Sequence, residues 1–157
     1  MAIKRLQSEY KQYIKDPSCH YNILPNEINF FEWDILLFGP DDTIFEGGIF
    51  QCKLIFTTDY PNKPPQLKFI TPLYHPNIFA NGVVCMSILH EGVDQFGYEH
   101  VSERWNPSHS VNSILMSMLL VLIEPNFDSP ANIDASKLWR DNFMEYKRII
   151  YTTIAKN

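Results

Sequence analysis

The sequence has few cysteines and lacks an excess of basic residues. Its three cysteines, Cys19, Cys52 and Cys85, are an odd number without a CxxC spacing, which argues against a disulfide framework and against a zinc site. We therefore expect no metal and a reducing compartment. The formal charge of −5 argues against a nucleic-acid-binding protein, whose affinity would come mainly from lysine and arginine contacts with phosphates. Proteins are the expected partners.

Long apolar segments are also absent. The amino-terminal segment MAIKRLQSEYKQYIK is charged throughout and lacks the apolar stretch of a secretory signal, while the longest apolar run, Ile114 to Ile123, is too short to span a bilayer. The chain shows no repeat, no low-complexity linker and no glycine-rich loop that would cradle a phosphate. We expect a cytoplasmic or nuclear protein without direct membrane insertion.

The first half of the chain predicts a helix followed by a sheet. With 157 residues and 45% hydrophobic content, the chain is long enough for one domain over residues 1–157 whose core needs no metal or disulfide. Apolar residues at helical spacing predict an amphipathic helix over 2–15, and Pro17 ends the pattern. Aromatic and β-branched runs between turn residues predict an antiparallel meander of four strands, over 21–24, 29–38, 49–56 and 67–71.

The second half of the chain predicts helices. Ser110 is suited to cap a buried helix with an apolar stripe, and Glu124-Pro125-Asn126 would close it. A short helix is predicted over 134–139 and a longer one over 141–154. One helix, a meander and three later helices give an α+β fold.

The aperiodic stretch 71–107 carries the candidate chemistry, because long irregular segments inside domains are commonly functional. A cysteine in a protein is often a buried core residue, and we interpret Cys19 and Cys52 in this way. Cys85 has the same alternative, but Asn77 lies just upstream of it on a constrained loop. Acyl transfer needs a thiolate that attacks an activated carbonyl and a fixed amide donor that stabilises the oxyanion. Cys85 and Asn77 are therefore candidates for these two roles.

A cysteine hydrolase is a competing interpretation, with His75 as the base. His75 immediately precedes Pro76, which restricts it to extended geometry. We therefore expect His75 to make structural hydrogen bonds to its own loop. A hydrolase would require a different base near Cys85 and an acyl site that water can reach.

The run HPNIFANGVVCMSIL, residues 75–89, resembles the signature of the ubiquitin-conjugating enzymes, in which His-Pro-Asn is followed at fixed spacing by Gly, Val-Cys and Ile-Leu. The resemblance extends over essentially the whole chain. Further matching blocks are Gly39-Pro40, Gly47-Gly48, Asp59-Tyr60-Pro61, Pro64-Pro65, Trp105 with Pro107, and Glu124-Pro125-Asn126.

An insertion distinguishes this chain from minimal members of that family. The segment HEGVDQFGYEHVSER, between Leu89 and Trp105, is longer than its counterpart in minimal members by about a dozen residues. Together with the runs EINFFEW and ANIDASKLWRD, it resembles the branch that serves degradation of proteins from the endoplasmic reticulum. Recruitment to that membrane would then come through a partner.

The resemblance implies a two-step reaction. Cys85 would accept the carboxy-terminal glycine of ubiquitin from an activating enzyme as a thioester, and a substrate lysine would attack that thioester to give an isopeptide bond. Asn77 would serve the second step. The activating enzyme would use the ATP, so no cofactor is expected. A RING-type ubiquitin ligase and a protein substrate are the other implied partners, with proteasomal degradation as the outcome.

The lysine side of the reaction departs from the family pattern. The acidic residue that often follows the Pro-Asn block, and that orients or deprotonates the lysine, is replaced by Ser129. Asp128, or His90 and Asp94 in the insertion, are candidates to supply the missing group. The alternative is that the acidic residues of the insertion form a solvated face; these are Glu91, Asp94, Glu99 and Glu103.

Partner surfaces carry over from the resemblance as well. Lys4 and Arg5 match positions that engage the activating enzyme, and two loops match ligase contacts, at Pro61, Asn62, Pro64, Pro107 and Ser108. Asn62 stands where a large apolar anchor is common, which alters the expected set of ligases. Phe79 stands where relatives often carry tyrosine, and its ring would flank the lysine stem or pack against its loop.

Two other interpretations keep the fold and change the function. One is a non-catalytic scaffold that binds ubiquitin, although such variants lack the cysteine that this chain has at Cys85. The other is an enzyme for a different ubiquitin-like modifier.

Overall fold

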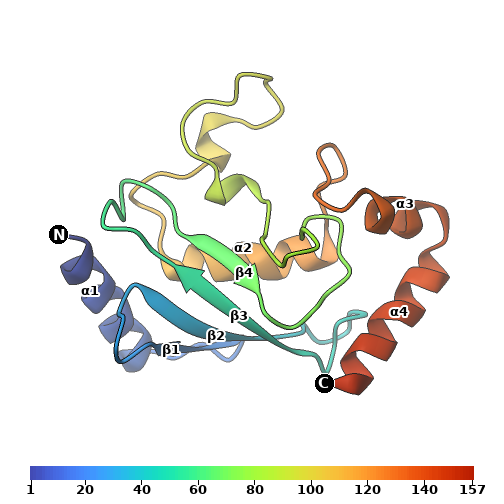
Figure 1. Ribbon diagram of the computed structural model, residues 1–157, viewed down its shortest axis with the longest axis horizontal. Helices are drawn as coiled ribbons and strands as arrows, with labels where there is room; N and C mark the ends of the chain where they lie inside the picture. The colour runs from blue at the N-terminus through green and yellow to red at the C-terminus, as the bar shows by residue number, and fades with distance from the viewer.

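The computed structural model describes residues 1–157 and is built on one four-stranded sheet, with one helix along it and helices at both ends (Figure 1). The helices are α1 (Ala2–Lys15), α2 (Val111–Ile123), α3 (Ile133–Asp141) and α4 (Phe143–Lys156). The strands are β1 (Tyr21–Pro25), β2 (Glu32–Phe38), β3 (Ile49–Ile55) and β4 (Gln66–Phe69). None of the helices is long and apolar enough to cross a bilayer.

The sheet is an antiparallel meander in the order β1-β2-β3-β4, as predicted. The prediction that the second strand begins at residue 29 was wrong. Asn26 Oδ1 accepts hydrogen bonds from the backbone N–H groups of Ile28 and Asn29, at 2.8 and 2.9 Å, and so forms a turn there. Asparagine side chains compete with strand hydrogen bonds in this way, which delays the strand to Glu32.

The last two helices are divided by one residue. The predicted boundary between them was early by about two residues, because Asn142 both ends α3 and caps α4. Its backbone N–H donates to Leu138 O at 2.8 Å, and its Oδ1 accepts from the N–H of Glu145 at 3.2 Å. An asparagine at this position satisfies donors that the start of a helix leaves free.

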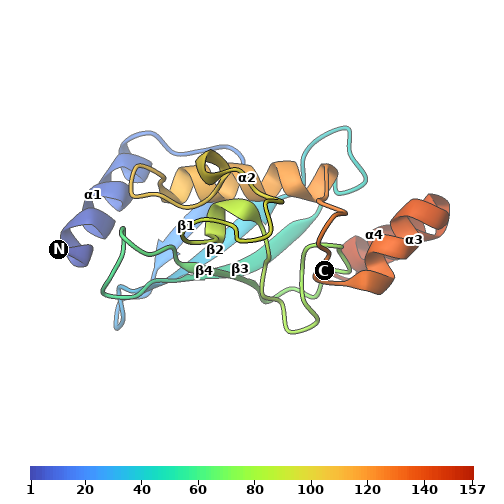
Figure 2. The ribbon, with the colours of Figure 1, turned by 90° about the horizontal axis from the view of Figure 1, so that it is seen from above.

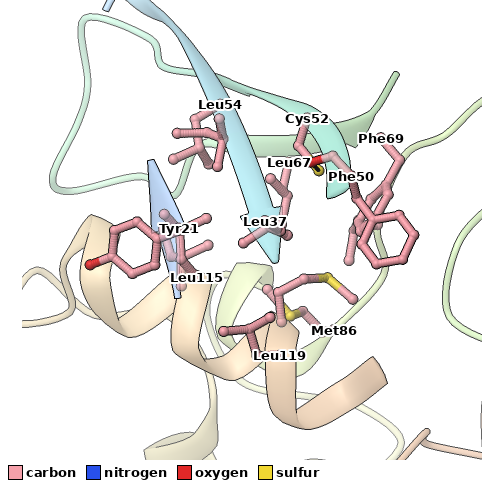
Figure 3. Packing of buried hydrophobic residues seen from close by; sticks show 14 of the residues in the cluster. Tyr21, Leu37, Phe50, Cys52, Leu54, Leu67, Phe69, Met86, Leu115 and Leu119 are labelled. Atoms are coloured by element: carbon pink, nitrogen blue, oxygen red, sulfur yellow. Dashed lines mark hydrogen bonds between the residues drawn. The ribbon is translucent and has the colours of Figure 1, made fainter. Parts of the chain in front are cut away.

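The core lies between α2 and one face of the sheet (Figure 3). The predicted cap is confirmed, since Ser110 Oγ accepts from the N–H of Ser113 at 3.1 Å. Leu115 and Leu119 of α2 face sheet residues such as Leu37. The apolar stripe of α2 is buried along its whole length, and so is one face of β3 with its extension: Phe50, Cys52, Leu54 and Phe56.

The three cysteines have different environments. Cys52 is fully buried in the core, as predicted, and burial raises the pKa of its thiol. Cys19 is exposed, so its interpretation as a core residue was wrong. It lies in the bend that connects α1 to β1, outside any helix or strand. Cys85 is half-buried.

The stretch between β4 and α2 is irregular, as predicted, and its insertion stands out from the rest of the molecule at the top of Figure 1. The view in Figure 2 shows the insertion lying over α2. Two 3-10 turns that the sequence did not reveal lie in the irregular stretch: Ser87–Leu89 directly before the insertion and Val101–Glu103 within it. Turns of three residues are too short to produce a detectable period.

Glu9 joins α1 to two other segments. Glu9 Oε1 accepts a hydrogen bond from the first backbone N–H of α2, that of Val111, at 2.7 Å. Glu9 Oε2 accepts from Tyr60 Oη and from Arg5 Nε, the latter at 3.1 Å. A carboxylate at a helix start satisfies a free N–H and complements the helix dipole. Arg5 completes the junction by donating from Nη2 to His109 O at 2.8 Å.

Replacement of Glu9 by alanine is therefore expected to destabilise the fold. Glu9→Ala leaves the Tyr60 hydroxyl, the Arg5 guanidinium and the Val111 N–H without their shared acceptor, so the free energy of unfolding should fall by about 2–3 kcal/mol. Urea denaturation measures this change. Glu27→Ala is the matched control, because Glu27 is exposed and should change the value by no more than about 0.5 kcal/mol. Equal effects of the two substitutions would contradict the junction.

Candidate active site

The loop that leads to Cys85 is docked against the edge strand β4. The N–H of Phe69 donates to Gly82 O at 2.7 Å, and the N–H of Val84 donates to Leu67 O at 2.9 Å. Gly82 has a φ of +92°, and a Cβ there would lie 2.1 Å from Phe69 O. Only glycine fits this close approach of two backbones. The sheet edge thus fixes the main chain directly before Cys85.

His75 has a structural role, as predicted. It is fully buried, and its Nδ1 accepts from the N–H of Asn77 at 3.0 Å. Because Nδ1 is an acceptor, Nε2 carries the proton and donates to Leu122 O at 3.1 Å. Burial lowers the pKa of His75 to about 4, against the opposing backbone hydrogen bonds, so the ring is neutral at pH 7. Both ring nitrogens are engaged with backbone, which excludes His75 as a base for Cys85.

Asn77 connects three segments and is 1% exposed. Its Nδ2 donates to Asn126 O at 2.9 Å, and its Oδ1 accepts from the N–H of Asn126 at 2.9 Å. Its backbone O accepts from the N–H of Cys85 at 2.8 Å. We call the two side-chain bonds the Asn77–Asn126 clasp. The clasp uses one hydrogen of the carboxamide and leaves the second free for another acceptor.

Cys85 opens into a cavity of about 440 Å³. Asn77 and the insertion form part of its wall, and the loop that follows α2 forms another part. The cavity brings together the four side chains that the sequence offered for the lysine step, which are His90, Asp94, Asp128 and Ser129. They lie between 5 and 44 residues from Cys85 along the chain. No group of three or more histidine, cysteine, aspartate or glutamate side chains is arranged to hold a metal ion.

His90 is the titratable side chain in direct contact with the thiol. Cys85 Sγ and His90 Nε2 are 3.5 Å apart, and His90 Nδ1 lies 2.8 and 3.0 Å from the two carboxylate oxygens of Glu99. A carboxylate only accepts hydrogen bonds, so Nδ1 is the donor to Glu99. The hydrogen bond to Cys85 raises the pKa of His90 most, burial opposes it and Glu99 adds to it, giving a value of about 9.

Comparison with known proteins shows the family of this chain. A family model described as "Ubiquitin-conjugating enzyme" matches residues 5–154. The chain belongs to the ubiquitin-conjugating enzyme family. It is 48% identical over 158 residues to ubiquitin-conjugating enzyme E2 G2 of Homo sapiens, which covers 99% of this chain and 96% of that relative.

Relatives from two other species give similar matches. The chain is 43% identical over 154 residues to ubiquitin-conjugating enzyme E2 15 of Schizosaccharomyces pombe, covering 97% of this chain and 92% of the relative. It is 46% identical over 135 residues to the probable ubiquitin-conjugating enzyme E2 7 of Caenorhabditis elegans, covering 85% and 82%. The resemblance found in the sequence, the fold class and the enzyme class are thereby confirmed: the protein is a ubiquitin-conjugating enzyme, a transferase.

The alternative that the acidic residues of the enzyme's insertion form a solvated face was wrong for Glu99. Its side chain is 11% exposed and pairs with both His90 and Arg104. Burial raises the pKa of Glu99, but the hydrogen bonds from His90 and Ser87 and the nearby charges outweigh it and hold the pKa below its ordinary value. Glu91 and Glu103 are exposed, as that interpretation requires.

Asp94 and Asp128 differ in what their carboxylates do. Asp94 Oδ1 and Oδ2 accept from the N–H groups of Phe96 and Glu99, both at 2.9 Å, and these bonds hold the pKa of Asp94 below its ordinary value. Asp94 therefore organises the turn of the insertion. Asp128 and Ser129 are exposed at the rim of the cavity.

Glu99 and Arg104 are the functional candidates that sequence reasoning missed. They lie 14 and 19 residues after Cys85 in a segment without periodicity, so no spacing rule connects them to it. Phe79 is 45% exposed and is not among the residues that line the cavity.

The two predicted ligase loops of the enzyme lie side by side. Trp105 Nε1 donates to Pro61 O at 2.8 Å, which joins them. Asn62, Pro107 and Ser108 are exposed, whereas Pro64 is half-buried. On α1, Lys4 is exposed. Arg5 is part of the Glu9 junction and stacks on the Tyr60 ring at 5.7 Å, so its guanidinium is already committed within the molecule.

Proposed function

We propose that Cys85 is the residue that carries ubiquitin, as a thioester received from the activating enzyme, and that a substrate lysine then takes ubiquitin from it. The observation that carries this proposal is the half-buried Cys85 sulfur in an open cavity, 3.5 Å from the His90 imidazole. An imidazole at this distance can take the thiol proton or stabilise the thiolate, which is the nucleophilic form. Cys52 is buried and its sulfur contacts the backbone O of Phe50, and Cys19 is exposed and lies outside this cavity.

His90 is the group that we propose for deprotonating the lysine. Its Nε2 faces the sulfur, so an amine that attacks the thioester carbon next to Sγ arrives within reach of the ring. Asp94 is held by two backbone N–H groups, and Asp128 lies exposed at the rim. Ser129 has no acidic group, so the insertion supplies the function that the usual acid has elsewhere in the family.

Asn77 is proposed to act in the second step through its remaining carboxamide hydrogen. The clasp fixes the amide plane before substrate arrives, so a donor aimed at the developing oxyanion needs no reorganisation. The clasp also holds the loop that carries Asp128 and Ser129. Loss of Asn77 therefore removes a donor and releases one wall of the cavity.

The cellular role follows the branch resemblance. We propose that ubiquitin is the modifier, that a RING-type ligase binds at the joined loops of Pro61 and Trp105, and that the activating enzyme binds α1 near Lys4. The enzyme itself would need no cofactor, since the activating enzyme uses ATP. The insertion and the runs EINFFEW and ANIDASKLWRD, by their resemblance to that branch, support a role in the degradation of endoplasmic-reticulum proteins, from the cytoplasm or nucleus and through a membrane-bound partner.

The hydrolase alternative now has the base that it required, because His90 lies next to Cys85. Hydrolysis would consume the thioester without lysine. Measuring thioester decay with and without lysine separates the two outcomes.

A loading assay tests the nucleophile. When the protein is mixed with activating enzyme, ATP and labelled ubiquitin, a non-reducing gel should show a thiol-sensitive adduct. Cys85→Ala should abolish it, and Cys85→Ser should give a weaker adduct that resists thiols. Cys19→Ala is the matched control and should load normally, because Cys19 is an exposed cysteine that does not line the cavity of Cys85. An adduct that survives Cys85→Ala would overturn the assignment, and loading only by another modifier would overturn ubiquitin alone.

Asn77→Ala should slow transfer from the preloaded thioester to lysine by roughly two to three orders of magnitude, because one oxyanion donor is lost. Thioester loading should survive. Single-turnover discharge measures the effect, and Asn81→Ala is the control, since Asn81 is an exposed asparagine of the same loop whose bond is to Val83 N–H only. A normal discharge rate in Asn77→Ala would leave the clasp as a purely structural feature.

The pH dependence of discharge identifies the base. His90 accepts a proton only when neutral, so the rate should fall as the pH decreases through the pKa of His90 in the loaded enzyme. His90→Gln should remove this acidic limb of the pH–rate profile, meaning the fall in rate at low pH, and should slow discharge by about a hundredfold. Asp128→Asn should change neither, and His20→Gln, at an exposed histidine, is the control. If only Asp128→Asn abolished the decrease in rate at low pH, Asp128 would be the base. If neither variant changed the profile, neither His90 nor Asp128 would be the base.

A further inference from the structure

Glu99 is the most constrained side chain of the insertion. Both of its carboxylate oxygens lie within 3.0 Å of His90 Nδ1, and one of them also accepts from Arg104 Nη1. Its backbone N–H donates to Asp94 Oδ2 at 2.9 Å. With 11% of the side chain exposed, Glu99 is held from two sides in a loop whose neighbours are mostly exposed.

Arg104 anchors this carboxylate to the other end of the insertion. Arg104 Nε donates to Gly92 O at 2.9 Å, and Nη2 donates to Glu91 O at 2.8 Å. The guanidinium thus bridges the start of the insertion to its end, and its side chain is 13% exposed. A planar group with several donors is suited to such a multiple contact. The ion pair with Arg104 therefore helps to hold the Glu99 carboxylate beside His90.

We propose that Glu99 is a positioning residue for proton transfer, held by Arg104, that fixes the His90 ring so that Nε2 always faces the sulfur of Cys85. This inference rests on the proposed role of His90. Because Glu99 accepts from Nδ1, a neutral His90 keeps its free lone pair on Nε2. The reacting nitrogen is therefore the one 3.5 Å from Sγ.

Glu99 matters most after ubiquitin is loaded. In the free enzyme, His90 interacts with the Cys85 thiol and with Glu99. Formation of the thioester consumes the thiol, so its contribution to the His90 pKa disappears and that of Glu99 remains. Arg104 pairs with Glu99, and Asp94 and Asp128 line the same cavity, whereas the side-chain partners of His90 are Cys85 and Glu99. Glu99 is then the principal group that sets the basicity and orientation of the ring.

The proton balance of the lysine step follows from this arrangement. Nε2 of neutral His90 takes one proton from the lysine ammonium, and the amine attacks the thioester carbon. The attack forms the new C–N bond and a tetrahedral oxyanion; as the oxyanion collapses, the C–S bond breaks, and the second proton of the attacking nitrogen goes to the departing sulfur, so that Cys85 leaves as a thiol beside the protonated His90. Glu99 stabilises the imidazolium throughout and does not itself take the proton, as in other carboxylate-histidine pairs.

Glu99→Gln tests the proposal, since glutamine keeps an acceptor oxygen but loses the charge. The variant should load ubiquitin, discharge to free lysine roughly tenfold more slowly on its plateau, and show its acidic limb shifted to lower pH by about one unit, because the pKa of His90 falls. Glu103→Gln is the matched control. Glu103 lies in the same insertion, is exposed, and contacts only the N–H of His100, so its profile should match the unmodified enzyme.

Two further measurements separate the possible failures. In a His90→Gln background, Glu99→Gln should change neither rate nor limb. If His90→Gln keeps the acidic limb of the pH–rate profile, the proposal that His90 is the base is wrong. If His90→Gln loses the acidic limb but Glu99→Gln has the same profile as the unmodified enzyme, only the proposed role of Glu99 is wrong. Should Glu99→Gln unfold, the ¹⁵N shifts of His90 in the unmodified protein decide: a proton on Nδ1 in the neutral ring is expected, and one on Nε2 overturns the proposal.

Discussion

The Asn77–Asn126 clasp is the contact on which the active site depends. Two hydrogen bonds join the loop before Cys85 to the loop after α2, which are 49 residues apart in sequence. Both bonds are made by the buried Asn77 side chain, whose amide groups they satisfy, to the backbone of Asn126. With the sheet edge holding one side of Cys85 and the clasp the other, the cavity has fixed walls on which the insertion is then placed.

The insertion is ordered by charge more than by apolar packing. Phe96 and Tyr98 are 81% and 72% exposed, so the aromatic residues contribute little buried area. Asp94, Glu99 and Arg104 instead bind backbone groups and one another across the loop. A partly buried ionic network is costly to break at one member, because its partners are left uncompensated. This property keeps the histidine at the thiol while leaving the cavity open to a large substrate.

The two histidines of the site show how surroundings decide function. His75 is surrounded by core and backbone, and burial lowers its pKa to about 4, so it holds its loop as a neutral ring. His90 has a thiol and a carboxylate as neighbours, and its pKa is raised to about 9. The same side chain is a structural connector in one place and a proton acceptor candidate in the other. Only the second can exchange protons with a substrate.

Local rules were sufficient for much of the protein. Periodicity and turn residues placed the meander, the cap at Ser110 and the buried stripe of α2, because these depend on neighbours within a few residues. The motif around Cys85 indicated the cysteine that we propose as the nucleophile, and His75 was recognised as structural from the proline that follows it. The solvent exposure of Cys19 and the roles of Glu99 and Arg104 were decided by the tertiary structure alone. Electrostatic pairing across an aperiodic loop depends on distance in space, which the sequence by itself does not encode in any local pattern.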